Sequence, residues 1–351
     1  MQPPPLREFA RIAVVQTAYT GDVALALPLM EALRQLHRES WRAMVVLPST
    51  AELAACAAAV DEVLVFDKRG AHRGVAGLRW CAEQLRRRGV ELLLVPHRSA
   101  RSALLAWMAR PRCAVGMDRS ALPWLLPVRV PYRWDLHEVE RNLSLLDPFP
   151  DIGERWRCYA RARVELRFAP HHREHLQRCL EELGIPQRQP LVVLAPGSVW
   201  QTKRWSARQY ARLARWLLRR DIAVVLTGTA AESELCRSIA QEGGGWSLAG
   251  RLGLPELLLL LERACCVVSN DSAPIHLAEL VQTPVVAVFG PTIPMFGFGP
   301  RLPSSAVVER ELPCRPCSLH GGRRCPLGTH ACMEELPAER VWERLEPLLP
   351  A

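Results

Sequence analysis

The chain has 351 residues, of which 49% are hydrophobic and 23% are charged, and its formal net charge at pH 7 is +9. This balance excludes a largely disordered chain, and the length indicates two domains. The N-terminal residues contain no apolar core of signal-peptide length, and the leucine run 257–261 is too short to span a bilayer. With twelve cysteines and no visible export signal, we expect a cytoplasmic protein with mostly free thiols.

The positive charge comes largely from arginine and favours anionic partners, such as phosphorylated lipid or a membrane surface. Four arginines recur on one face of the predicted helix 206–220, and a solvated helix face is their simplest interpretation. They are Arg208, Arg212, Arg215 and Arg219. No basic patch interleaved with aromatic residues is visible, so we expect no nucleic-acid partner.

Short apolar runs alternate with helical patterns along the chain, which predicts parallel sheets covered on both faces by helices. The expected strands are 12–16, 43–47, 62–66, 92–96, 191–195, 223–227, 265–269 and 285–289. The expected helices between them include 24–36, 99–109, 206–220 and 274–280. A proline-punctuated segment, 147–190, separates the halves, and we place the domains at 1–168 and 169–351. We expect the last helix, 338–349, to cross back to the first domain.

Gly21 and Asp22 lie between the first predicted strand and its helix. We expect Gly21 to permit a close or left-handed backbone and Asp22 to stand at the head of the helix. A carboxylate in this place is suited to take a proton from a hydroxyl group as a new bond forms. From spacing alone, however, a helix cap is the simpler interpretation of Asp22.

Two turns in the second half carry further candidates. Ser198 and Lys203 lie in the loop 196–205, where a fixed cation can stabilise a leaving diphosphate. Glu232 follows the glycine turn after strand 223–227, where a carboxylate can accept ribose hydroxyls, with Glu234 as a weaker rival. The alternatives are a solvated lysine and a first-turn glutamate favoured by the helix dipole.

The segment 265–292 is the most informative part of the chain. It predicts a buried strand, the turn Asn270-Asp271-Ser272, a helix with Pro274 in its first turn, and a second buried strand. Such a turn presents free backbone N–H groups and the positive end of a helix dipole at the carboxyl edge of a parallel sheet. The sequence therefore predicts a phosphate site there.

The run Asn270-Asp271-Ser272-Ala273-Pro274-Ile275-His276, followed by Phe289-Gly290-Pro291-Thr292, resembles the nucleotide-sugar signature of the ADP-heptose:lipopolysaccharide heptosyltransferases, glycosyltransferase family 9. Arg98-Ser99-Ala100 and Lys203-Arg204-Trp205 look more similar to lipopolysaccharide heptosyltransferase II than to heptosyltransferase I. The resemblance implies an α/β glycosyltransferase B fold, with two doubly wound Rossmann-like domains facing a central cleft.

The resemblance also implies a function in Gram-negative bacteria. It is inverting transfer of L-glycero-D-manno-heptose from ADP-heptose to a heptose of the lipopolysaccharide inner core, with peripheral contact to the inner membrane and no cofactor required for catalysis. Asp22 would be the base and Lys203 the second catalytic residue. The donor would also contact Ser198, Glu232, Asp271, Ser272, Ala273 and His276, and the acceptor Gly21, Arg98 and Arg101. Ala273 departs from the glycine most usual in the family. A lone histidine in the place of His276 is more often structural, but the family sets a histidine there beside the diphosphate.

Four cysteines, Cys314, Cys317, Cys325 and Cys332, lie in the loop 314–332. Their spacing suits a structural zinc or iron site with four thiolates, and free cysteines are the alternative. Some protein-directed heptosyltransferases bind iron in this way. The cluster therefore keeps two rival functions open: a heptosyltransferase acting on protein, and a non-catalytic, metal-dependent assembly protein of the same fold. A nucleotide-sugar 2-epimerase would need further acid and base carboxylates.

Overall fold

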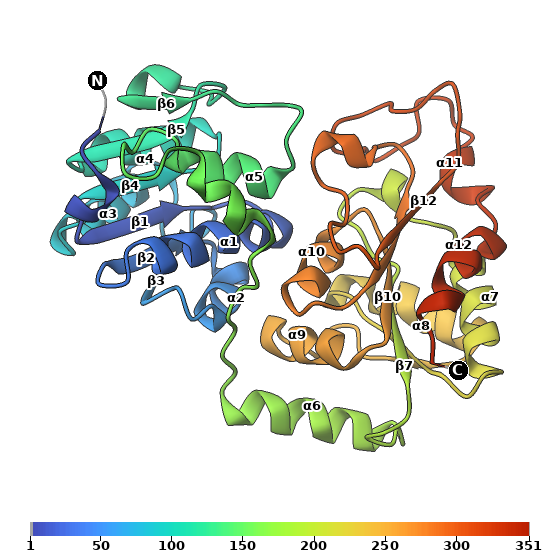
Figure 1. The fold of residues 1–351 in the computed structure, drawn as a ribbon. Helices are drawn as coiled ribbons and strands as arrows, with labels where there is room; N and C mark the ends of the chain where they lie inside the picture. The colour runs from blue at the N-terminus through green and yellow to red at the C-terminus, as the bar shows by residue number, and fades with distance from the viewer. Residues whose placement is uncertain (1–2, 351) are drawn as a thin grey trace. The chain divides into compact units, whose positions relative to one another are not determined.

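The computed structural model describes residues 3–350, which divide into two compact units, Met1–Arg167 and Phe168–Ala351. The boundary drawn from the sequence lies one residue further along the chain. Each unit contains a six-stranded parallel sheet with helices interleaved between the strands (Figure 1). Within residues 3–350, no helix has both the length and the apolar character needed to cross a membrane.

In unit 1 the strand order is β3-β2-β1-β4-β5-β6. The strands are β1 (Arg11–Val15), β2 (Trp41–Val46), β3 (Glu62–Val65), β4 (Leu92–Val95), β5 (Cys113–Met117) and β6 (Val128–Val130). The main helices are α1 (Thr20–Leu36), α2 (Ala51–Cys56), α3 (Gly74–Arg87), α4 (Ala100–Ala109) and α5 (Glu138–Leu143). Because β4 is covered on both faces, all four of its residues are buried, as its continuous apolar sequence requires.

Unit 2 has the order β12-β11-β10-β7-β8-β9. Its strands are β7 (Leu191–Ala195), β8 (Ala223–Leu226), β9 (Trp246–Ser247), β10 (Cys266–Asn270), β11 (Val285–Phe289) and β12 (Ala306–Glu309). Its helices are α6 (Pro170–Glu182), α7 (Ala207–Leu218), α8 (Ser233–Gly243), α9 (Leu254–Arg263), α10 (Ala273–Leu280), α11 (Ala331–Glu334) and α12 (Ala338–Leu345). Read from β9, this is the same order as in unit 1.

The predicted α/β class, with two doubly wound sheets, is therefore confirmed. In each sheet the strand order reverses at the first strand of the unit, between β1 and β4 and between β7 and β10. Open α/β sheets bind ligands outside the carboxyl ends of the strands at such a point. These two edges are consequently where functional side chains are expected to gather.

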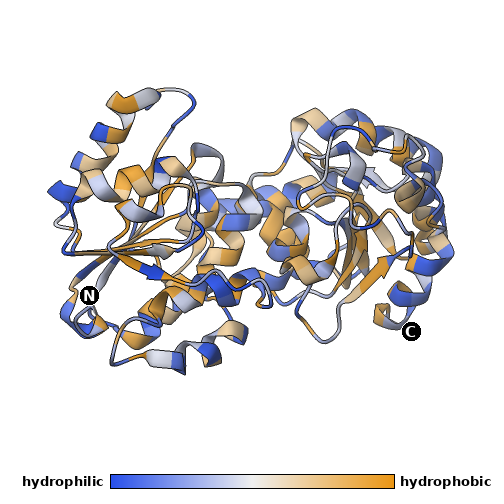
Figure 2. Cartoon of the chain, turned by 90° about the horizontal axis from the view of Figure 1, so that it is seen from above, coloured by the Kyte–Doolittle hydropathy of each residue, from blue (hydrophilic) through white to orange (hydrophobic). Residues whose placement is uncertain are grey.

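Apolar residues concentrate in the strands and on the helix faces that cover them (Figure 2). Helix α12 packs against α7, β11 and β12, and its Val341 and Leu345 are buried in the core of unit 2. The expectation that the last helix crosses to the first domain stays a prediction. The apolar stripe of α12 completes the core of its own unit.

Candidate functional site

The switch point of unit 1 joins the loops that follow β1 and β4. The Thr17 hydroxyl lies 3.2 Å from Nδ1 of His97, and the Ser102 hydroxyl lies 3.0 Å from the same nitrogen. Lys68, which follows β3, donates from Nζ to the carbonyl oxygen of Thr17. Three strand ends thus meet at the edge where α1 begins.

Asp22 lies in the first turn of α1 and is partly exposed. Its Oδ2 accepts the backbone N–H of Tyr19 at 3.1 Å, so Asp22 is a helix cap. Burial and the nearby Glu138 carboxylate nevertheless raise the pKa of Asp22 to about 6, with Arg98 opposing them. A carboxyl group with this pKa is well matched to a proton acceptor near neutral pH.

Of the two expectations for Gly21, a close or a left-handed backbone, the left-handed one is not met, because Gly21 lies within the first turn of α1. The two arginines expected near the acceptor lie on the loop and first turn after β4. The Arg98 guanidinium lies 3.9 Å from the ring centroid of Tyr132, and Arg101 is exposed. Sequence reasoning missed Lys68, whose pKa is lowered by burial and by Arg101 and Arg69. Its position just after a parallel strand was the available signal.

The switch point of unit 2 brings Lys203 to the start of α10. Lys203 Nζ lies 2.6 Å from Oδ2 of Asp271, and the two side chains are only 12% and 7% exposed. The Thr292 hydroxyl donates to the same carboxylate oxygen at 2.6 Å. Lysine and aspartate are thus held beside the N-terminus of α10, whose backbone N–H groups favour an anion.

Asn270, at the end of β10, fixes the loops around this site. Its Nδ2 donates to the carbonyl of Pro196 at 2.7 Å, and its Oδ1 accepts the backbone N–H of Trp205 at 2.9 Å. Ser272 precedes α10 as its cap residue, its hydroxyl donates to the carbonyl of Gly197 at 3.4 Å, and Ala273 opens the helix. The turn after β10 is therefore tied to the turn after β7.

His276 lies in α10 and is only 6% exposed. Burial lowers the pKa of His276 to about 4, with Asp271 opposing and Arg301 and Lys203 reinforcing the shift. Its Nδ1 is buried and has no hydrogen-bond partner among the described residues. A buried polar atom without a partner is unfavourable, so this nitrogen points to a ligand atom or a water molecule that binds there.

Ser198 lies in the loop that follows β7, and Glu232 contacts this loop. Glu232 Oε2 accepts the backbone N–H of Thr229 at 2.8 Å, so it caps its own helical turn. A Cβ atom at Gly197 would lie 2.1 Å from Glu232 Oε1, so the Glu232 carboxylate packs against the backbone of this loop. The carbonyl of Ser198 accepts two bonds from the Arg204 guanidinium, at 2.9 and 2.7 Å.

The cysteine loop does not form the expected metal site. Cys314 and Cys317 are exposed, Cys325 is half-buried, and Cys332 is buried, which raises the pKa of the Cys332 thiol to about 11. Within residues 3–350, no three side chains of cysteine, histidine, aspartate or glutamate are placed to hold a metal ion. The structure therefore does not support structural zinc or iron in this loop.

The same loop holds the segment that carries Lys203. The Thr202 hydroxyl donates to the carbonyl of Gly322 at 3.0 Å and accepts its N–H at 2.8 Å. His330 Nε2 lies 2.8 Å from the carbonyl oxygen of Thr202. A Cβ atom at Gly321 would lie 3.1 Å from Cγ of Lys203. The loop thus positions the lysine, which no short-range sequence pattern indicates.

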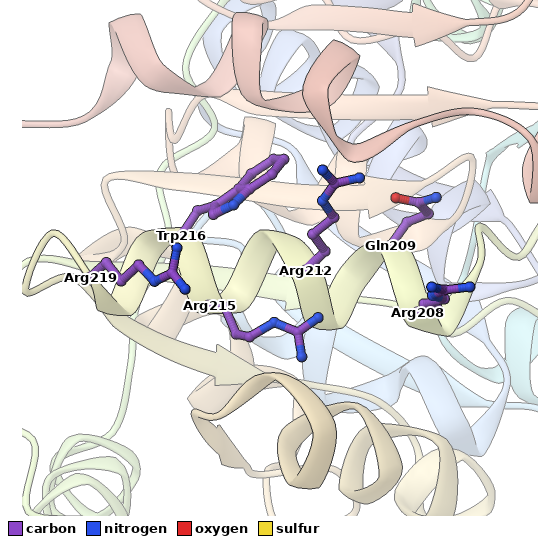
Figure 3. A pocket seen from close by; sticks show the side chains of 6 residues that line it. All are labelled: Arg208, Gln209, Arg212, Arg215, Trp216 and Arg219. Carbon is purple, nitrogen blue, oxygen red and sulfur yellow. The ribbon is translucent and has the colours of Figure 1, made fainter.

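The arginine stripe predicted from the sequence lines a surface hollow along α7 (Figure 3). Its lining residues are Arg208, Gln209, Arg212, Arg215, Trp216 and Arg219. Arg212 pairs with Glu339, and Arg215 lies 3.9 Å from Glu242. None of the residues described above at the switch point of unit 2 lines this hollow.

Comparison with known proteins places these features in context. Lipopolysaccharide heptosyltransferase 2 of Salmonella typhimurium is 30% identical over 177 residues, which are 48% of this chain and 49% of that protein. The chain thus matches about half the length of this relative. Heptosyltransferase 3 of Escherichia coli is 25% identical over 79% of this chain and 82% of its own length.

Among solved structures, a family 9 glycosyl transferase from Veillonella parvula has a TM-score of 0.83 at 22% identity, over 97% of both chains. ADP-heptose lps heptosyltransferase II from E. coli has a TM-score of 0.77 at 22% identity, over 96% of this chain and 98% of that one. These likenesses confirm the predicted two-domain α/β fold of the glycosyltransferase B kind. The sequence model of glycosyltransferase family 9 (heptosyltransferase) matches residues 79–324, and the chain belongs to this family.

Proposed function

We propose that the chain transfers L-glycero-D-manno-heptose from ADP-heptose to a heptose of the lipopolysaccharide inner core, with inversion at the sugar. The observation that carries this proposal is the placement of Lys203 beside the N-terminus of α10, at the switch point of unit 2. The membership in family 9 and the names of the matched relatives support it.

In this proposal unit 2 binds the donor. The diphosphate lies at the N-terminus of α10, where Lys203 and the backbone N–H groups after Ser272 supply positive charge. The neutral imidazole of His276 offers its partnerless Nδ1 to the same ligand. Glu232 accepts the ribose hydroxyls, and Ser198 completes the loop beside them.

Unit 1 supplies the base. The acceptor hydroxyl oxygen attacks the anomeric carbon of the heptose, and its proton passes to the Asp22 carboxylate. The bond from the anomeric carbon to the diphosphate oxygen breaks, so ADP leaves with added negative charge. Lys203 and the helix N-terminus stabilise that charge as it forms. Lys68, Arg98 and Arg101 offer cations to anionic groups of the acceptor.

A lipid-linked acceptor places the reaction at a membrane surface. We therefore include peripheral contact with the cytoplasmic face of the inner membrane in this proposal. The net charge of +9 supports such contact, since anionic lipids attract basic proteins.

The test is ADP release by the purified chain, given ADP-heptose and a series of truncated core acceptors. An acceptor that ends in one heptose should support turnover, and an acceptor without heptose should not. Release of ADP only with the heptose-free acceptor would reassign the step. No release with any core acceptor, together with no effect of ADP on the melting temperature, would contradict the proposed function.

A further inference from the structure

Two tryptophans of unit 1 are unusually exposed and lie on neighbouring elements. Trp107, on α4, is 54% exposed, and Trp124, on the short 3-10 helix Pro123–Leu125, is 70% exposed. Helix α4 packs against this 3-10 helix, and the N–H of Ala121 bonds to the carbonyl of Arg98 at 3.0 Å. The two tryptophans thus lie on elements that pack against each other.

The surface around the tryptophans is apolar. Four apolar side chains on or next to these two elements pack against the core of unit 1 and are only partly buried: Leu104, Met108, Leu122 and Leu125. An outer helix face normally carries polar residues, yet α4 places Leu104, Trp107 and Met108 there. We call the two tryptophans and the four partly buried residues together the α4 face. Two exposed tryptophans on contacting elements, flanked by half-buried apolar side chains, indicate an interaction site.

The segment of the chain that carries the α4 face is strongly basic. Residues 98–133 contain seven arginines and one acidic residue. Arg110 ends α4, and Arg119 and Arg129 lie within five residues of Trp124 on either side. All three are exposed, and within residues 3–350 none of them forms an ion pair with a carboxylate. Their charge is therefore available to an anionic partner.

We propose that the α4 face docks on a bilayer that contains anionic lipid. Tryptophan is enriched at membrane interfaces because its ring is apolar and its N–H is polar, and unpaired arginines attract anionic headgroups. The basic character of this segment argues for a lipid surface over a second apolar protein surface. This inference rests on the proposed function and deepens it, because α4 begins beside Arg98 and Arg101, which would receive the lipid-linked acceptor, and carries Trp107 in its last turn.

The experiment is co-sedimentation of the full chain with vesicles of phosphatidylcholine alone or mixed with phosphatidylglycerol. The wild type should bind the mixed vesicles and release them at high salt, since salt screens headgroup charge. Trp107→Ala with Trp124→Ala should weaken binding by about tenfold or more, because less apolar area enters the interface. Arg119→Glu with Arg129→Glu should weaken it by more than about tenfold, since each arginine near an anionic surface contributes about fivefold.

The matched control is Arg208→Glu with Arg219→Glu, which changes the charge equally on the exposed arginine stripe of α7. This variant should bind vesicles like the wild type. Equal loss in the control and the Arg119 and Arg129 variant, or no wild-type binding to anionic vesicles, would overturn the proposal. The ADP-induced rise in melting temperature, measured on every variant, checks the fold and the donor site separately from the membrane contact.

Discussion

The ion pair between Lys203 and Asp271 permits the most direct test of the proposed donor site. Its atoms lie 2.6 Å apart, and the side chains are 12% and 7% exposed. Removing one partner of a buried pair costs about 3–5 kcal/mol, because the other charge stays buried without compensation. We take the lower end, since some exposure remains. Lys203→Met should therefore lower the free energy of unfolding by about 3 kcal/mol, which is a fall of about 6–12 °C in Tm for a domain of this size.

A double variant separates stability from binding. Lys203→Met combined with Asp271→Asn removes both charges, while the amide oxygen still accepts the hydroxyl of Thr292. Most of the lost stability should return. Binding of ADP should not return, because a hydrogen bond from a charged group contributes about 1.5–3 kcal/mol. Both variants should therefore bind ADP about 10- to 150-fold more weakly than the wild type.

Denaturant unfolding gives the stabilities, and the ADP-dependent rise in Tm gives the affinities. If the double variant recovers ADP affinity together with stability, Lys203 has a structural role only, and the proposed contact with the diphosphate is wrong. If Lys203→Met is as stable as the wild type, the pair is not held in solution as the structure shows it.

Three further predictions concern single residues. Asp22→Asn keeps the cap but removes the base, so turnover should fall by about 10²–10⁴-fold with ADP binding unchanged. Because the pKa of Asp22 is raised to about 6, wild-type turnover should rise with pH up to about 6 and then stay constant. This rise of turnover with pH should be absent from Asp22→Asn. Gly321→Ala should weaken ADP binding, since its Cβ would lie 2.9 Å from Cβ of Trp200 and 3.1 Å from Cγ of Lys203 and would displace the lysine segment. Gly328→Ala, also at positive φ but with no atom within 4 Å of the added Cβ, should leave ADP binding unchanged. Burial lowers the pKa of His276 to about 4, so the imidazole should stay neutral above about pH 5.5. The ratio of the ADP affinities of the wild type and His276→Asn should therefore stay constant between about pH 5.5 and 8. A ratio that changes near pH 6.5 would show that the imidazole becomes charged.

The strands that sequence reasoning found are those with a continuous apolar run, such as β7 and β11, in which every residue is buried. The strands it missed lack that signal. Strand β9 has two residues, and β6 is an edge strand with an exposed arginine at its centre. In β5, Gly116 interrupts the apolar pattern because a Cβ there would lie 2.5 Å from a methyl group of Leu126. Short edge strands and packing glycines depend on the neighbouring chain, which local periodicity does not contain.

The candidate site likewise contains residues that local sequence patterns reveal and residues that depend on contacts far along the chain. The turn residues Asp271 and Ser272 were visible as a cap signature, because capping chemistry is local. The role of Asn270 was not, since its amide bonds to Pro196 and Trp205, which lie more than sixty residues away in the chain. The contact of the cysteine loop with Thr202 spans about 120 residues, and spacing between cysteines suggested a metal instead. A cysteine pattern reports proximity along the chain, and metal binding requires convergence in space.

Asp22 and Glu232 show why a capping interpretation and a functional interpretation do not exclude each other. Each carboxylate accepts a backbone N–H at the start of a helical turn, so each is a cap by geometry. The first turn of a helix after a parallel strand is also where the dipole is positive and where ligands of open sheets bind. One position therefore satisfies both requirements, and the cap fixes the side chain that would act. For Asp22, the raised pKa distinguishes it from an ordinary cap, because the N–H bond and the dipole would by themselves lower the pKa of the carboxyl.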